Sequence, residues 1–179
     1  MKEIRLHGRG GLGSVKAAEV LVYAAVKDGK YGNSIPFFGF ERQGAPVTAF
    51  VKISDKPIRA KNRVNNPDIV VVLDPTIMNA VNVFEGIKDN STLILNTKQN
   101  IDDIKIPANV KTVALIDATK ISLDILGKSI TNTVMLGAFC RVTELVDIKY
   151  VSEKVEELWG SKNVETLIKG SELVKVYNF

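Results

Sequence analysis

The sequence contains very little of the two residue types that most often build metal and redox sites. It has one cysteine, Cys140, and one histidine, His7, among 179 residues. One cysteine cannot form an internal disulfide or supply the four thiolates of an iron–sulfur cluster. One cysteine and one histidine are also too few ligands for a typical zinc site. We therefore expect this chain to hold no metal of its own, and to carry no metal-centred redox chemistry.

Long hydrophobic runs are also missing from the sequence. No apolar stretch approaches the roughly 20 residues that a membrane-spanning helix needs. The first residues, MKEIRLHG, lack the apolar core and small-residue cleavage site of a secretion signal. The composition, 45% hydrophobic and 25% charged, is typical of globular proteins. We expect a cytoplasmic chain without a membrane partner, folded as one domain over residues 1–179.

Charge of one sign is not concentrated enough to indicate a nucleic-acid surface. The net charge is +4, and the lysines and arginines are scattered. The single acid-poor basic stretch covers residues 56–63 and contains no aromatic side chain, which disfavours nucleic-acid binding. A solvated loop is the favoured interpretation, and a docking surface for an acidic partner or an anionic cofactor is the alternative.

Strand-like and helix-like segments alternate along most of the chain. Residues 2–7 and 47–54 alternate in polarity, whereas residues 69–73, 91–97 and 111–117 are more continuously apolar, as in buried parallel strands. A helical pattern follows the first strand, with Ser14 as a plausible N-cap and Gly29 as the C′ residue. A second, short helix is expected at 76–84. The later helices are expected at 118–126, 131–146, 152–159 and 163–176.

This order of elements predicts the α/β fold class. We expect a three-layer α/β/α sandwich around a mostly parallel or mixed central sheet, with a Rossmann-like first unit. The segment 31–46 (YGNSIPFFGFERQGAP) has three glycines, two prolines and no clear period. We expect a long irregular loop there, and such loops are often functional.

The loop between the first strand and helix carries the spacing Gly8-x-Gly10-x-x-Gly13. A dinucleotide site also needs an acid at the end of a second strand about 20 residues on, and counting from Gly13 reaches only Asn33. A nucleotide-hydrolysing P-loop needs a lysine where this chain has Ser14. Two interpretations remain, a tight structural turn and an anion-binding loop formed by Gly8, Arg9, Gly10, Gly11 and Gly13.

A second group of residues favours an interaction surface. Phe38, Glu41, Arg42 and Gln43 lie in the irregular segment, between phenylalanines and Gly44-Ala45-Pro46. A neighbouring glutamate and arginine often form only a weak surface pair. Aromatic residues and arginine are nevertheless the preferred anchors of protein interfaces, so we interpret these four as interface residues.

No set of residues forms a self-sufficient active site. Asp74 and Asp117 follow strands and are best interpreted as helix or turn caps. His7 could act as a general base, but no nucleophile or paired carboxylate accompanies it, which favours a structural histidine. Cys140 lies in an apolar helical pattern, where a free cysteine behaves as a small hydrophobic residue. We expect no catalytic residue here, and therefore a subunit rather than a free-standing enzyme.

Together the motifs resemble those of a known family. The stretches His7–Gly13 (HGRGGLG), Ala17–Glu19 (AAE), Pro36–Phe50 (PFFGFERQGAPVTAF) and Pro67-Asp68 through Asp74-Pro75 are similar to the gamma chain of 2-oxoacid:ferredoxin oxidoreductases. The second motif is closest to the pyruvate enzyme, pyruvate synthase. Leu12 and Gln43 depart from the family pattern, which often has glutamine and a second arginine there.

The resemblance implies a role inside a larger enzyme. Such enzymes decarboxylate a 2-oxoacid oxidatively to an acyl-coenzyme A, and pass the electrons to ferredoxin. It implies alpha, beta and delta-type partner subunits, with thiamine diphosphate, Mg²⁺ and [4Fe-4S] clusters bound by those partners. Coenzyme A is the co-substrate, and this chain is expected to organise the complex and to lie near the coenzyme A route. The alternative is a stand-alone nucleotide- or dinucleotide-binding α/β domain.

Overall fold

The computed structural model describes residues 1–37, 44–59 and 62–179. Its strands and helices, in chain order, are β1 (Lys2–Arg9), α1 (Ser14–Lys27), β2 (Tyr31–Phe37), β3 (Pro46–Ser54), β4 (Ile69–Val72), the 3-10 helix η1 (Pro75–Asn79), β5 (Ser91–Asn96), the 3-10 helix η2 (Ile101–Asp103), β6 (Val110–Ile116), α2 (Ala118–Leu126), α3 (Asn132–Thr143), α4 (Ile148–Trp159), α5 (Ser161–Leu173) and β7 (Lys175–Asn178).

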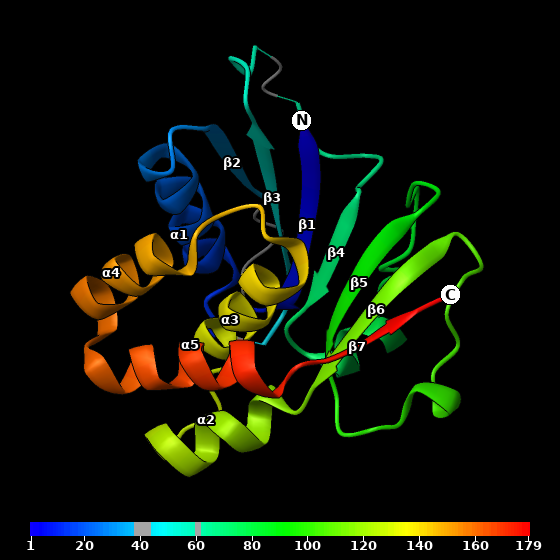
Figure 1. Cartoon of the computed structure of the whole chain (residues 1–179). Helices are drawn as coiled ribbons and strands as arrows, with labels where there is room; N and C mark the ends of the chain where they lie inside the picture. The colour runs from blue at the N-terminus through cyan, green and yellow to red at the C-terminus, as the bar shows by residue number, and fades with distance from the viewer. Residues whose placement is uncertain (38–43, 60–61) are drawn as a thin grey trace.

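The strands form one seven-stranded mixed sheet in the order β2-β3-β1-β4-β5-β6-β7. The central strands β1, β4, β5 and β6 are parallel. β3 pairs antiparallel with β1, β7 pairs antiparallel with β6, and the edge strand β2 pairs antiparallel with β3. Each parallel strand ends at the same edge of the sheet, near α2 in the lower part of Figure 1. This arrangement confirms the predicted α/β class with a mixed sheet.

The two faces of the sheet are covered differently. The first core packs Ile4, Leu6 and Val71 of the sheet against residues of α1, α3, α4 and α5 (Figure 1). The second core packs Val70 and Leu93 on the opposite face against η1, η2 and the segments around them. The second outer layer therefore consists of 3-10 helices and loops in the described residues, where the sequence suggested α-helices.

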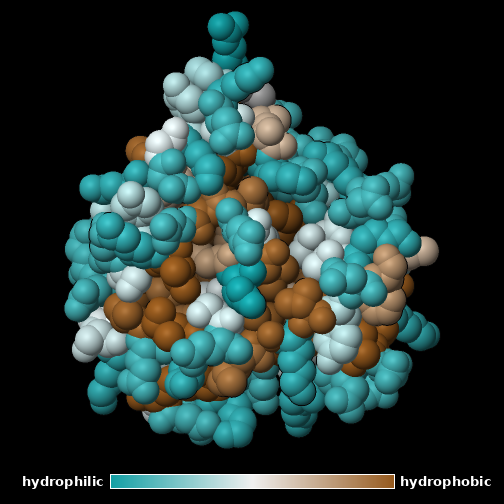
Figure 2. All heavy atoms as spheres, viewed as in Figure 1, coloured by the Kyte–Doolittle hydropathy of each residue, from teal (hydrophilic) through white to brown (hydrophobic). Residues whose placement is uncertain are grey.

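Helix α3 lies at the centre of the helical layer. Its first nine residues, 132–140, are all buried. It crosses α5 so closely that a Cβ at Gly137 would overlap the Leu167 carbonyl, and a Cβ at Gly170 would overlap the Val134 carbonyl. Figure 2 shows apolar side chains gathered at the centre of the viewed face, ringed by hydrophilic ones. The fold thus depends on two glycines that let these helix backbones touch.

Three local predictions were wrong. Tyr31–Phe37 is not part of an irregular loop but forms β2, paired antiparallel with β3 over its whole length. Ser14 is not the N-cap of α1; Gly13 is, and α1 begins at Ser14. The chain ends in a strand, β7, where the sequence suggested helix up to residue 176. Within the described residues, no helix is both long and apolar enough to cross a membrane.

Candidate functional site

The glycine loop connects the end of β1 to the start of α1 at the carboxyl edge of the parallel strands. The Gly10 N–H donates to the Ala45 carbonyl (2.9 Å), and the Gly44 N–H donates to the Gly10 carbonyl (3.3 Å). Gly11 and Gly13 have φ angles of 95° and 77°, which side chains of L-residues rarely adopt. Of the predicted loop residues, Gly8 and Arg9 end β1, and Gly10, Gly11 and Gly13 lie in the tight turn that follows.

Two of these glycines lie close to neighbouring side chains. A Cβ at Gly8 would overlap the hydroxyl of Ser14, and a Cβ at Gly13 would lie 2.6 Å from Asn132 Nδ2 of α3. The Ser14 hydroxyl is itself buried and has no hydrogen-bond partner among the described residues. The glycine pattern thus has a structural explanation at Gly8 and Gly13, whatever the loop binds.

Arg9 points from the end of β1 to the loop after β4. Its Nε lies 3.2 Å from Asp74 Oδ2, and its Nη1 donates to the Gly44 carbonyl at 2.9 Å. Its Nε and Nη2 also donate to the Thr76 hydroxyl, at 3.1 and 3.0 Å. Asp74 in turn accepts hydrogen bonds from the N–H and hydroxyl of Thr76. The guanidinium is therefore already paired within the chain, so it is not an uncommitted cation.

This ion pair occupies the crevice where open α/β sheets usually bind ligands. The chain leaves β1 toward β3 and β2 on one side and returns to β4 on the other, so the switch point lies between β1 and β4. Asp74 follows β4, the parallel neighbour of β1, and so stands where an acid could hold a ribose. Because Asp74 is bound to Arg9 and caps η1, it does not serve as a ribose ligand in this arrangement.

Three helices begin at this edge of the sheet. α1 follows Gly13, α2 is capped by Asp117, and α3 follows Thr131, whose hydroxyl donates to the Leu73 carbonyl. The N–H groups of Gly11, Gly13 and Ser14 donate no hydrogen bond within the described residues. Helix N-termini carry partial positive charge, so the backbone of the loop, more than Arg9, provides an environment suited to an anion.

The buried histidine does not serve as a general base. Burial, reinforced by the nearby Arg5 guanidinium, lowers the pKa of His7 to about 3. The Arg5 Nε donates to His7 Nε2 at 3.0 Å, which places the proton of the neutral ring on Nδ1. The Arg5 Nη2 donates hydrogen bonds to the carbonyls of Val83 and Glu85. His7 is therefore part of the contact between β1 and the segment that covers the second sheet face.

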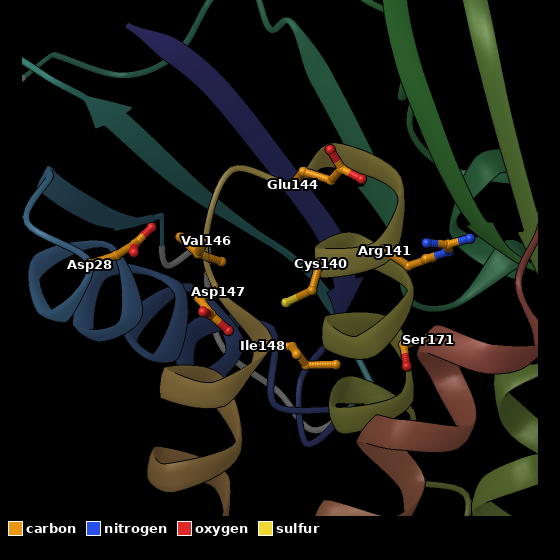
Figure 3. A pocket seen from close by; sticks show the side chains of 8 residues that line it. All are labelled: Asp28, Cys140, Arg141, Glu144, Val146, Asp147, Ile148 and Ser171. Atoms are coloured by element: carbon orange, nitrogen blue, oxygen red, sulfur yellow. The ribbon is translucent and has the colours of Figure 1, made fainter.

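Cys140 is also chemically inert. Burial is the main cause that raises the pKa of the Cys140 thiol to about 12, so the reactive thiolate is not formed near neutral pH. The residue lines a cavity of about 470 Å³ between α3, α4 and the end of α1, with Asp28, Arg141 and Glu144 around it (Figure 3). Among the described residues, no three histidine, cysteine or acidic side chains are grouped closely enough to hold a metal ion.

Sequence reasoning missed a large cavity at this edge. A cavity of about 940 Å³, which we call the strand-end cavity, lies at the carboxyl ends of β5 and β6, next to η1, η2 and the start of α2. Its lining includes Met78, Leu95, Lys98, Ile104, Lys105 and Leu123. The available signal was Asn96, a polar residue directly after a buried apolar strand. Its side chain donates to the Leu73 carbonyl and accepts from the Ala118 N–H, joining β4, β5 and α2.

The predicted interface residues Phe38, Glu41, Arg42 and Gln43 lie outside the described residues, so their role stays a prediction. The glycine-loop residues are brought together as expected, and their binding of an anion also stays a prediction.

Comparison with known proteins identifies the family. Residues 3–173 match the family model described as pyruvate ferredoxin/flavodoxin oxidoreductase. The chain is 48% identical to the pyruvate/ketoisovalerate oxidoreductases common subunit gamma of Thermococcus kodakarensis, over 92% of each chain. It is 50% identical to the pyruvate synthase subunit PorC of Methanothermobacter marburgensis, over 92% of this chain and 93% of that one.

A solved structure agrees with these matches. The crystal structure of the pyruvate oxidoreductase subunit PORC from Thermotoga maritima superposes with a TM-score of 0.86 at 34% identity, covering 99% of this chain and 100% of that one. The chain therefore belongs to the pyruvate ferredoxin/flavodoxin oxidoreductase family, in which it corresponds to the gamma-type subunits.

Proposed function

We propose that this chain is the gamma subunit of a multi-subunit 2-oxoacid:ferredoxin oxidoreductase that acts on pyruvate. The observation that carries the proposal is the nearly full-length similarity, at 48–50% identity, to subunits named for the pyruvate and ketoisovalerate enzymes. The relative from Thermococcus kodakarensis is named as common to two such enzymes. This shared use supports a subunit whose single domain, residues 1–179, organises the complex and leaves the choice of 2-oxoacid to partner chains.

The proposed partners are alpha, beta and delta-type subunits, with ferredoxin as the electron acceptor of the complex. Thiamine diphosphate, Mg²⁺ and [4Fe-4S] clusters are assigned to those subunits, because one cysteine cannot ligate such a cluster. The full-length similarity to enzyme subunits favours this proposal over a stand-alone nucleotide-binding domain. Asp74, the acid that follows the strand beside β1, is paired with Arg9, and this pairing also disfavours a ribose contact there.

Assembly is tested by affinity purification. The chain, tagged and co-expressed with the three other subunits encoded by the same organism, is expected to co-purify with all of them as one complex on size exclusion. A tagged chain that elutes alone under the same conditions contradicts the proposal.

The glycine loop is the proposed point of contact with coenzyme A. Its support is the turn's position at the carboxyl edge, its backbone N–H groups at the start of α1, and the suitability of such groups for phosphate. Arg9 fixes the loop against Asp74 and Thr76, so its removal would misplace these N–H groups.

Kinetics of the assembled enzyme test this contact. Arg9→Gln is expected to raise the KM for coenzyme A about tenfold, because the loop N–H groups lose the side chain that holds them in place, with the KM for pyruvate unchanged. Lys162→Gln, which alters an exposed lysine at the start of α5, is the matched control. An Arg9→Gln enzyme that assembles fully and keeps its KM for coenzyme A would exclude the loop as a binding element.

A further inference from the structure

We propose that the strand-end cavity is a nucleotide-binding site, separate from the glycine loop. Its volume of about 940 Å³ lies at the upper end of the range of roughly 300–1,000 Å³ that small-molecule sites occupy. It also lies at the carboxyl ends of two parallel strands, where α/β folds bind ligands. The inference rests on these residues alone and does not depend on the proposed function.

The apolar part of the lining suits a flat ring. Leu95 is 1% exposed and forms part of the wall at the end of β5. Met78 after β4 and Ile104 after η2 are both half-buried. Leu123 of α2 keeps 48% of its surface exposed although it lines the same cavity. A nucleobase in contact with these side chains would cover the exposed leucine, which is a favourable burial.

The cavity is lined by three lysines (Lys98, Lys105 and Lys120) and three aspartates (Asp103, Asp117 and Asp124), and two of the lysines are placed to meet a phosphate. Lys98 and Lys105 line the cavity, and among the described residues neither has a carboxylate within the 4.0 Å of an ion pair. Lys120 differs, because it pairs with Asp124 at 2.7 Å. Two unpaired ammonium groups beside an apolar wall are the arrangement expected for a ligand with an apolar body and an anionic end.

Neutral and acidic polar groups complete the match to a nucleoside. The Thr119 hydroxyl accepts from Asn96 Nδ2 and keeps its own proton available to donate. Asp103 at the end of η2 lines the same space, and a carboxylate there can accept hydrogen bonds from sugar hydroxyls. Apolar, anionic and hydroxyl-bearing parts of one ligand therefore each have a counterpart, and nucleoside phosphates combine all three.

Calorimetric titration of the full chain tests the site. ADP and ATP are expected to bind. Adenosine, which lacks the phosphate, and inorganic phosphate, which lacks the base and the sugar, are expected to bind at least about tenfold more weakly. The double variant Lys98→Ala/Lys105→Ala should weaken ADP binding by about tenfold or more. The matched control is Lys162→Ala/Leu158→Ala, which changes exposed residues of α4 and α5 outside the cavity and should leave binding unchanged.

A second variant tests the apolar wall, with Leu123→Glu compared against Leu158→Glu. Only the first should weaken binding of ADP. Absence of binding by every nucleotide overturns the proposal, as does binding that survives the double lysine variant. Binding of ADP or coenzyme A that is lost in Arg9→Gln but not in the cavity variants would place the site at the glycine loop and also overturn it. Because no partner subunit is present, failure here leaves the gamma-subunit assignment standing.

Discussion

At the scale of single residues, the Ser14 side chain determines whether position 8 can carry a side chain larger than that of glycine. Its φ is not in the left-handed region, so alanine causes no backbone strain there, and the only severe overlap is with the Ser14 hydroxyl. Gly8→Ala should therefore lower the free energy of unfolding by about 1–2 kcal/mol. Urea denaturation measures this change.

The double variant Gly8→Ala/Ser14→Ala provides the control. Ser14→Ala alone should be neutral or slightly stabilising, since it removes a buried hydroxyl that has no partner among the described residues. With the hydroxyl gone, the new methyl group at position 8 meets Ser14 Cβ only at 3.5 Å, an ordinary contact. If the double variant is as unstable as Gly8→Ala, the overlap is not the cause.

The lowered pKa of His7 predicts that the stability of the folded chain depends on pH. Its pKa is about 3 in the folded chain against 6.5 when exposed, so between these values the unfolded chain binds the extra proton. Stability from this group is complete above pH 6.5 and is lost as the pH falls toward 3. From pH 7 to pH 5 the loss should be about 2 kcal/mol in the free energy of unfolding.

His7→Gln isolates this contribution, because glutamine can accept from Arg5 but does not titrate. The variant should lose about 2 kcal/mol less than the native chain between pH 7 and pH 5, as measured by urea denaturation at both pH values. Equal losses in both proteins would show that folding does not lower the pKa of His7.

At the scale of elements, the crossing of α3 and α5 is the most demanding contact of the helical layer. Gly137 and Gly170 each lie against backbone of the other helix, and the Thr133 and Thr166 hydroxyls are hydrogen-bonded at 2.6 Å across the crossing. Glycine to alanine normally stabilises a helix interior by about 1 kcal/mol. Here Gly137→Ala and Gly170→Ala should each destabilise by about 2–3 kcal/mol, because backbone cannot move aside.

Ser171→Ala, next to Gly170 but half-buried, is the control and should change the unfolding free energy little. Thermal denaturation of the three variants gives the comparison. Stabilisation by either glycine variant would mean that the helices are farther apart than described.

The elements that the sequence predicted correctly are those whose pattern reflects burial. β4 and β5 are enclosed by the two cores, so their continuous apolar runs identified them. β2 was missed because it is an edge strand that contains Gly32, Asn33 and Pro36, residues that disfavour strands. β7 was missed because it is a four-residue edge strand that directly follows a helical pattern.

The site was predictable in position but not in its contacts. The spacing of Gly8, Gly10 and Gly13 located the turn before α1. Arg9 contacts Asp74 and Thr76, which are more than 60 residues away in the sequence. They become its neighbours only because β4 pairs with β1. The strand-end cavity was missed for the same reason, since it is formed by segments that meet only through the order of the sheet.

At the scale of the whole molecule, the chain is a gamma-type member of its family with an internally paired Arg9 and no reactive His7 or Cys140. We propose that it contributes to a reaction through what it assembles and positions. The two surfaces that we propose for this, the glycine loop and the strand-end cavity, both lie at one edge of the sheet.

The most direct test of the central claim is reconstitution of activity with and without this chain. The alpha, beta and delta-type subunits are purified together, and pyruvate- and coenzyme A-dependent reduction of ferredoxin is measured before and after addition of the chain. The rate is expected to be low or absent without the chain. Addition of the chain should raise it until it saturates at one chain per set of partners. A rate that is already complete without the chain, and unchanged by adding it, would contradict its role as the gamma subunit of this enzyme.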